Sequence, residues 1–153
     1  MGQSSLHATC LIVGEAGVLI RGRSGAGKSK LARALMSEAA QRGLFARLVG
    51  DDRVSLEALH GRLIARGHPE IAGLIEARGL GILRGAAEPA CVIRLVVDLA
   101  DETGARIPER ADRSTIIESL VVPRLSLGPE ADRADLVFGA LQLSPQPIVV
   151  IGG

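Results

Sequence analysis

The chain has 153 residues, of which 47% are hydrophobic and 23% charged, and its formal net charge is +1. This length suits one domain with a proper core and is too short for two ordinary domains. The nearly neutral charge gives no electrostatic footprint for nucleic acid or an anionic membrane. Phe45 and Phe138 are the only aromatic residues, which removes the stacking platforms of proteins that bind single strands.

The N-terminal residues and the lack of a long apolar run indicate a cytoplasmic protein. The first residues are polar, and no apolar run reaches membrane-spanning length. We therefore expect one cytoplasmic domain over residues 1–153, with no membrane or nucleic-acid partner. Cys10 and Cys91 lie inside apolar, strand-like runs, so two buried structural thiols are expected rather than a disulfide or a metal site.

Hydrophobic periodicity predicts a mixed α/β fold. Short branched apolar runs predict strands at residues 7–13, 18–21, 45–49, 91–99 and 114–122, and a hairpin joining 54–56 to 63–65. Helices are predicted at 29–41, at 70–78 after Pro69, and at 131–143. We read 79–82 as a turn into an edge strand, 101–113 as a charged loop, and 147–153 as a small strand or a tail. Because strands and helices do not alternate regularly, this order favours a mixed sheet around a phosphate-loop core.

A complete G-x-x-x-x-G-K-S phosphate-binding loop joins the predicted strand 18–21 to the predicted helix 29–41. It consists of Gly22, Arg23, Ser24, Gly25, Ala26, Gly27, Lys28 and Ser29. Glycines let successive backbone N–H groups point inward as an anion nest, and the opening helix adds its dipole. Lys28 is expected to reach the β- and γ-phosphates, and the Ser29 hydroxyl to bind Mg²⁺. The sequence therefore predicts a site for a nucleotide or a phosphate.

Two adjacent acids follow the predicted strand 45–49. Asp51 and Asp52 stand where a Walker B-type pair is expected downstream of such a loop. One carboxylate can face the metal-bound phosphates while its neighbour accepts a proton from a hydroxyl nucleophile. Their residue types leave open which of the two is the base.

Two further segments resemble one family, the catalytic domain of HPr kinase/phosphorylase. The first is His7 followed by the loop and by Leu48-Val49-Gly50-Asp51-Asp52-Arg53-Val54. The second runs from Pro69-Glu70-Ile71 to Leu74-Ile75-Glu76-Ala77-Arg78-Gly79-Leu80-Gly81-Ile82. The resemblance covers about residues 6–145. It implies the HPr kinase/PEP carboxykinase-like nucleotide-binding fold, in the short alphaproteobacterial form without the additional N-terminal domain of fuller members.

The resemblance also implies an activity and a set of roles. It implies a protein-serine kinase that uses ATP and Mg²⁺ to phosphorylate HPr, the phosphocarrier of the phosphotransferase system, and that can reverse the reaction by phosphorolysis. Mg²⁺ is expected near Ser29 and Glu76, His7 near the phosphate or the acid pair, and Arg106 as the arginine that completes the site. The family forms hexamers, so we expect a homo-oligomer.

The chain departs from the family pattern at three places. Arg23 and Lys30 stand where the family usually has acidic residues, so both changes add positive charge beside the phosphates. Of the phosphorolysis segment of fuller members, only residues 122–128 retain a likeness. Kinase activity is therefore better supported than its reverse.

Three other functions use the same kind of loop. A GTP-binding switch needs a base-reading Asn-Lys-x-Asp motif, but the chain contains no Asn. A small-molecule kinase needs a lid with several arginines, which the segment 101–113 offers. A regulatory module that binds nucleotide without phosphotransfer needs the loop alone.

Overall fold

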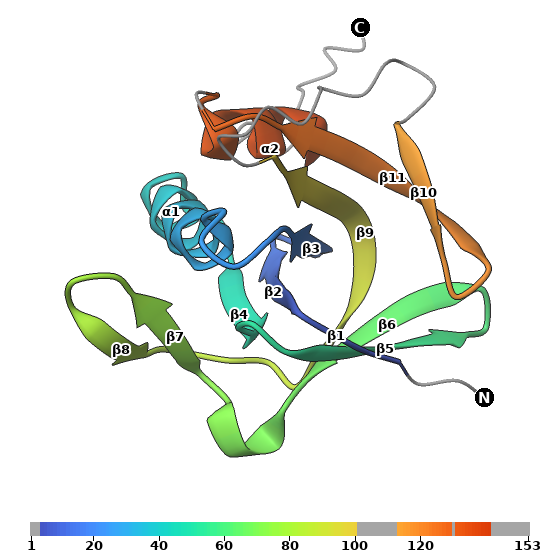
Figure 1. Cartoon of the computed structure of the whole chain (residues 1–153), viewed down its shortest axis with the longest axis horizontal. Helices are drawn as coiled ribbons and strands as arrows, with labels where there is room; N and C mark the ends of the chain where they lie inside the picture. The colour runs from blue at the N-terminus through green and yellow to red at the C-terminus, as the bar shows by residue number, and fades with distance from the viewer. Residues whose placement is uncertain (1–3, 101–112, 130, 142–153) are drawn as a thin grey trace, which may run out of the picture.

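The described residues form a strongly curved nine-stranded mixed sheet with helices on one of its faces, together with a separate two-stranded sheet over residues 74–77 and 81–84 (Figure 1). The computed structural model describes residues 4–100, 113–129 and 131–141. The strand order is β1-β5-β6-β9-β3-β2-β4, with β11 on β9 and β10 on β11. In chain order the elements are β1 (Ser4–Leu6), β2 (Ala8–Val13), β3 (Ala16–Arg21), α1 (Lys28–Gln41), β4 (Ala46–Gly50), β5 (Val54–Leu59), β6 (Arg62–Gly67), a 3₁₀ turn (Pro69–Ile71), β7 (Leu74–Ala77), β8 (Gly81–Arg84), β9 (Ala90–Leu99), β10 (Ser114–Ile117), β11 (Leu120–Leu127) and α2 (Arg133–Leu141). The predicted mixed α/β fold is confirmed.

Strand β9 organises the sheet. Along one edge it runs parallel to β3, with Leu19 opposite Val96. It has two further partners: the first residues of β9 pair antiparallel with β6, and its last residues pair parallel with β11. Because β6 and β11 diverge, β9 bends along its length, as Figure 1 shows. Because β3, β9 and β11 run parallel, their carboxyl ends meet at one edge of the sheet. Ligands bind at this edge in open α/β sheets.

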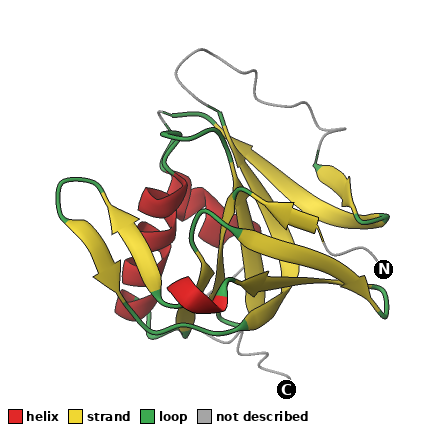
Figure 2. Cartoon of the chain, turned by 60° about the horizontal axis from the view of Figure 1, so that its bottom comes forward, coloured by secondary structure: helices red, strands yellow, loops and turns green. Residues whose placement is uncertain are grey.

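Two cores stabilise the two faces of the sheet. Leu31, Leu35 and Ala39 of α1 pack against one face together with Val137 and Phe138 of α2. Their spacing along α1 places all three on one side of the helix, so the apolar side is buried and the polar side is exposed. The second core lies on the opposite face and consists of strand residues, among them Leu19, Val54, Leu56, Leu63 and Val96. Figure 2 shows both helices on the same side of the curved strands.

The two cysteines belong to this second core. Cys10 on β2 and Cys91 on β9 are both buried and free, which confirms the expected burial. Their Sγ atoms lie 3.4 Å apart, an approach that sequence reasoning did not anticipate. Gly17 makes room for it, since a Cβ there would lie 2.7 Å from the Cys91 Sγ. Burial, with the neighbouring thiol, raises the pKa of Cys10 well above its ordinary value.

The helix predicted at 70–78 is wrong. The chain forms only a 3₁₀ turn over Pro69–Ile71 and then enters strand β7. Gly73 has a φ of 79°, which is not a helical conformation, so the chain cannot continue as a helix through it. Only glycine fits at this position, because a Cβ there would lie 2.6 Å from the Gly85 carbonyl oxygen. In β7, buried Ile75 and Ala77 flank exposed Glu76, which is the period of a strand with one buried face. Ile75 thereby joins the core beside α1.

The other predicted elements are present with small shifts in their bounds. The hairpin of β5 and β6 turns at His60 and Gly61, both with positive φ, as two-residue hairpin loops require. The run predicted at 114–122 is a second hairpin, β10 and β11. The charged segment 101–113 and the tail 147–153 lie almost wholly outside the described residues. Within the described residues, no helix is long and apolar enough to cross a membrane.

Candidate active site

The phosphate loop leaves β3 at the sheet edge where the parallel strands end, and it runs directly into α1. Gly25 and Gly27 have φ values of 86° and 102°, a backbone conformation that glycine adopts without strain. Gly27 is the N-cap of α1, so the loop ends at the positive end of the helix dipole. This geometry is typical of an anion site built from backbone N–H groups.

Lys28 occupies the interior of the loop. The residue is only 7% exposed, and its Nζ donates to the carbonyl oxygens of Gly22 at 3.0 Å and Arg23 at 3.3 Å. The loop therefore holds the ammonium group by its own backbone, where a bound phosphate would meet it. The two residues that depart from the family pattern are both exposed: Arg23 lies within the loop and Lys30 directly after it.

Asp51, at the end of β4, is tied to the phosphate loop. Its Oδ1 accepts hydrogen bonds from Ser29 Oγ at 2.5 Å and from Thr9 Oγ1 at 2.9 Å. Its Oδ2 accepts one from the backbone N–H of Glu76 at 3.0 Å. With 8% of its surface exposed, Asp51 is a buried carboxylate whose charge these three donors satisfy.

Asp52 faces a different way from its neighbour. Its φ is 64°, in the left-handed region that Asp tolerates better than most residues. This turn leaves its side chain 68% exposed and brings its Oδ1 within 3.7 Å of His7 Nδ1. The two adjacent carboxylates are thus separated, one toward the loop and the other toward solvent and His7.

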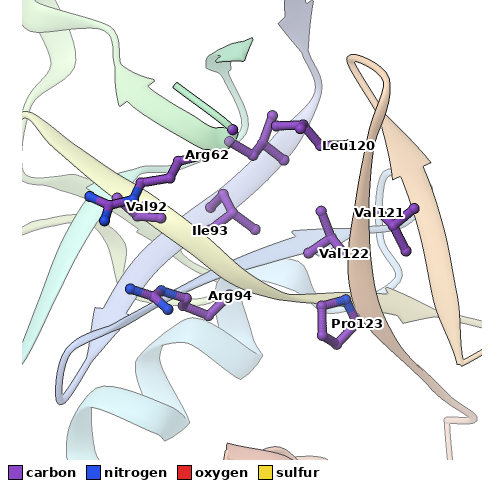
Figure 3. A pocket seen from close by; sticks show the side chains of 10 residues that line it. Arg62, Val92, Ile93, Arg94, Leu120, Val121, Val122 and Pro123 are labelled. Atoms are coloured by element: carbon purple, nitrogen blue, oxygen red, sulfur yellow. The ribbon is translucent and has the colours of Figure 1, made fainter. Parts of the chain in front are cut away.

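A hollow of about 320 Å³ opens in front of Asp52. Its lining residues are His7, Asp51, Asp52, Arg53, His68, Glu70 and Ile71. A larger hollow of about 430 Å³ lies elsewhere, between β6, β9 and β11, where Ile93 and Val122 contribute apolar lining (Figure 3). The larger hollow is lined by arginines and apolar residues and holds no carboxylate or histidine. Of these two hollows, the smaller one is thus the one lined by carboxylate and imidazole side chains, which can transfer protons.

The magnesium ligands expected from the sequence fit only in part. Ser29 and Asp51 bring a hydroxyl and a carboxylate together, which are hard oxygen donors of the kind that Mg²⁺ takes along with phosphates and water. Glu76 approaches Asp51 through its backbone, whereas its side chain is exposed. Within the described ranges, no three His, Cys, Asp or Glu side chains form a ready-made metal cluster. Arg106 lies outside the described residues.

Sequence reasoning missed two residues of this region, Thr9 and Asp98. Thr9 is a fully buried hydroxyl on β2 that donates to Asp51 and accepts weakly from the Asp52 N–H at 3.4 Å. Asp98, near the end of β9, accepts two hydrogen bonds from Arg21 at 2.7 and 2.8 Å and another from Arg124. In both cases a polar residue interrupts an apolar strand, and this pattern in the sequence could have predicted them.

The Asp98 cluster predicts an acid-sensitive stability. Burial alone would raise the pKa of Asp98, but the hydrogen bonds and charges of Arg21 and Arg124 outweigh it and lower that pKa. A carboxyl with a depressed pKa stabilises the fold above its unfolded pKa, about 3.9, and loses that contribution as the pH falls toward the folded value. Asp98→Asn should cost about 1–3 kcal/mol of unfolding free energy at pH 7, measured by urea denaturation.

The difference in unfolding free energy between wild type and Asp98→Asn should then narrow as the pH is lowered below about 4. Glu15→Gln, which removes an exposed carboxylate from the turn before β3, is the control and should track wild type. A difference in unfolding free energy that stays constant down to pH 2 would contradict a stabilising role for the ionised Asp98 carboxylate.

Comparisons with known proteins agree on one family. The family model of the "HPr Serine kinase C-terminal domain" matches residues 1–122. An HPr kinase/phosphorylase of Limosilactobacillus reuteri is 34% identical over 143 residues, covering 86% of this chain and 42% of that protein. One of Mycoplasma mycoides is 42% identical over 76 residues, covering 50% and 22%. The chain therefore spans less than half the length of these curated relatives.

The solved structure of the Hpr(Ser) kinase/phosphatase from Coxiella burnetii has a similar fold. Its TM-score is 0.73 at 26% sequence identity, and the match covers 91% of this chain and 88% of that one. The fold resemblance predicted from the sequence is confirmed.

Proposed function

The chain belongs to the HPr serine kinase C-terminal domain family, and on that premise we propose that it is an ATP- and Mg²⁺-dependent kinase that phosphorylates a serine of the phosphocarrier protein HPr. The observation that carries this proposal is the division between two neighbouring carboxylates. Asp51 is hydrogen-bonded to Ser29 of the phosphate loop at 2.5 Å, while Asp52 is exposed in the adjoining hollow. Phosphoryl transfer to a hydroxyl of another protein needs one carboxylate on the phosphate side and a second carboxylate that is open to the acceptor.

On the phosphate side, the chain supplies charge and orientation. Backbone N–H groups of the loop and the N-terminus of α1 bind the phosphate oxygens, and Lys28 moves from the loop carbonyls to the transferring phosphoryl group. Ser29 and Asp51 would hold Mg²⁺, with Glu76 as a further candidate. When bound, Mg²⁺ neutralises the phosphate charge that grows on the leaving group.

On the acceptor side, Asp52 is the candidate base. It takes the proton of the serine hydroxyl as the serine oxygen bonds to the γ-phosphorus and the bond from that phosphorus to the leaving ADP oxygen breaks. His7, 3.7 Å from the Asp52 carboxylate, positions this group and is open to the acceptor at 80% exposure. The exposure of both side chains suits an acceptor that arrives on another protein.

The kinase direction is the one we propose as the main activity. In the reverse direction, the same carboxyl would return its proton to the serine oxygen while inorganic phosphate attacks. Arg124, in the segment that resembles the phosphorolysis segment of fuller relatives, is part of β11 and pairs with Asp98. This pairing favours a structural role for Arg124 over recruitment of free phosphate.

Incubation with HPr, Mg²⁺ and ATP labelled at the γ-phosphate tests the proposal. We expect label on HPr, and none on an HPr variant whose accepting serine is alanine. Bound ATP without labelled HPr would instead favour the regulatory module. Label on a small molecule of a cell extract, with none on HPr, would favour a small-molecule kinase.

A further inference from the structure

Arg133 connects the phosphate loop to two other elements of the sheet edge. It is the first residue of α2, and 107 positions separate it from its partner in the loop. Its Nη1 donates to the Ala26 carbonyl oxygen at 2.8 Å, its Nη2 to that of Ala100 at 3.0 Å, and its Nε to that of Gly128 at 3.0 Å. One guanidinium group therefore holds the loop and the residues that directly follow β9 and β11.

The bond to Ala26 fixes the orientation of the next peptide N–H. A trans peptide unit is planar, so its carbonyl and its N–H point in opposite directions. With the Ala26 oxygen turned to Arg133, the Gly27 N–H points away from the guanidinium. It is one of the loop N–H groups that a nest can offer to an anion. The packing is close, because a Cβ on Gly27 would lie 3.0 Å from the Arg133 Nη1.

Arg133 also differs from the nearby arginines in its partners. Arg21 and Arg124 share the carboxylate of Asp98, which offsets part of their combined charge. Within the described part of the chain, the hydrogen-bond partners of Arg133 are all backbone carbonyls. A guanidinium keeps its proton at any physiological pH, so a positive charge without a carboxylate partner among the described residues lies directly behind the loop.

We propose that Arg133 is a positioning residue of the phosphate loop: it holds the Ala26–Gly27 peptide in the orientation that binds anions and adds positive potential behind it. This proposal rests on the proposed function only in that the loop binds a polyphosphate. Arg133 acts through the loop backbone and through its charge, without touching the phosphates.

Isothermal titration of ATP and of inorganic tripolyphosphate into Arg133→Gln tests the proposal. Loss of charge-assisted hydrogen bonds should weaken binding of both ligands by about 10- to 100-fold relative to wild type. In the transfer assay, the KM for ATP should rise while the KM for HPr stays unchanged. Arg94→Gln is the matched control, since it removes the same charge from an exposed position in the larger hollow and should bind tripolyphosphate like wild type.

Two further results separate positioning from simple stabilisation. Arg133→Lys keeps the charge but loses the fork that reaches three carbonyls, so its tripolyphosphate affinity should lie between those of wild type and Arg133→Gln. An Arg133→Gln protein that melts earlier yet binds both ligands as tightly as Arg94→Gln would overturn the proposal. Wild-type protein that binds tripolyphosphate but leaves HPr unlabelled would overturn the proposed kinase and leave this inference standing.

Discussion

Asp52→Asn should abolish most phosphotransfer to HPr while ATP binding is retained. Loss of a general base typically lowers a rate by about 10²- to 10⁴-fold, and Asp52 contacts no residue of the phosphate loop among its described hydrogen bonds and ion pairs. The substitution is mild for the fold, because Asn adopts the left-handed conformation at φ 64° at least as readily as Asp. Single-turnover transfer from labelled ATP measures the effect.

Glu70→Gln is the matched control for that experiment. Glu70 is another exposed carboxylate that lines the same hollow, so its loss changes the charge of the hollow without removing the candidate base. We expect its transfer rate to stay within a few-fold of wild type. Equal rates in Asp52→Asn and wild type would show that the base is elsewhere.

Lys28→Ala should weaken the binding of ATP itself. The buried ammonium of Lys28 is the cation inside the loop, and a hydrogen bond to a charged group contributes about 1.5–3 kcal/mol, or roughly 10- to 150-fold in affinity. The comparison with Lys30→Ala is direct, since these are the only two lysines and Lys30 is exposed two positions further along α1.

Titration of ATP into the two lysine variants measures this difference in affinity. Lys30→Ala should retain most of the wild-type affinity, and thermal melts without nucleotide should show both variants folded. Similar ATP affinity in Lys28→Ala and Lys30→Ala would contradict the phosphate-loop assignment.

Local patterns predicted the parts of the site that local chemistry determines. The loop, the strand before it and α1 depend on residues within a short stretch, so their prediction needed no knowledge of the rest of the chain. The position of Asp51 and Asp52 at the end of a strand was visible for the same reason. Their different orientations were not, because a single left-handed residue at Asp52 separates them and Asp gives only a weak signal for it.

Features that depend on distant partners escaped prediction. The segment around Glu76 has apolar spacing that suits a helix, but Gly73 packs against Gly85 and turns it into a hairpin. Arg133 belongs to no motif, and only the fold brings it to Ala26. Helix propensity is a weak prior that tertiary contacts override.

In the proposed mechanism, Asp51 serves the metal and the phosphates while Asp52 serves the acceptor. The most direct test of this division is the affinity for ATP measured with and without Mg²⁺ in Asp51→Asn and Asp52→Asn. We expect Mg²⁺ to strengthen ATP binding in wild type and in Asp52→Asn, and to have little effect in Asp51→Asn. A Mg²⁺ effect that survives in Asp51→Asn and disappears in Asp52→Asn would contradict this division of roles.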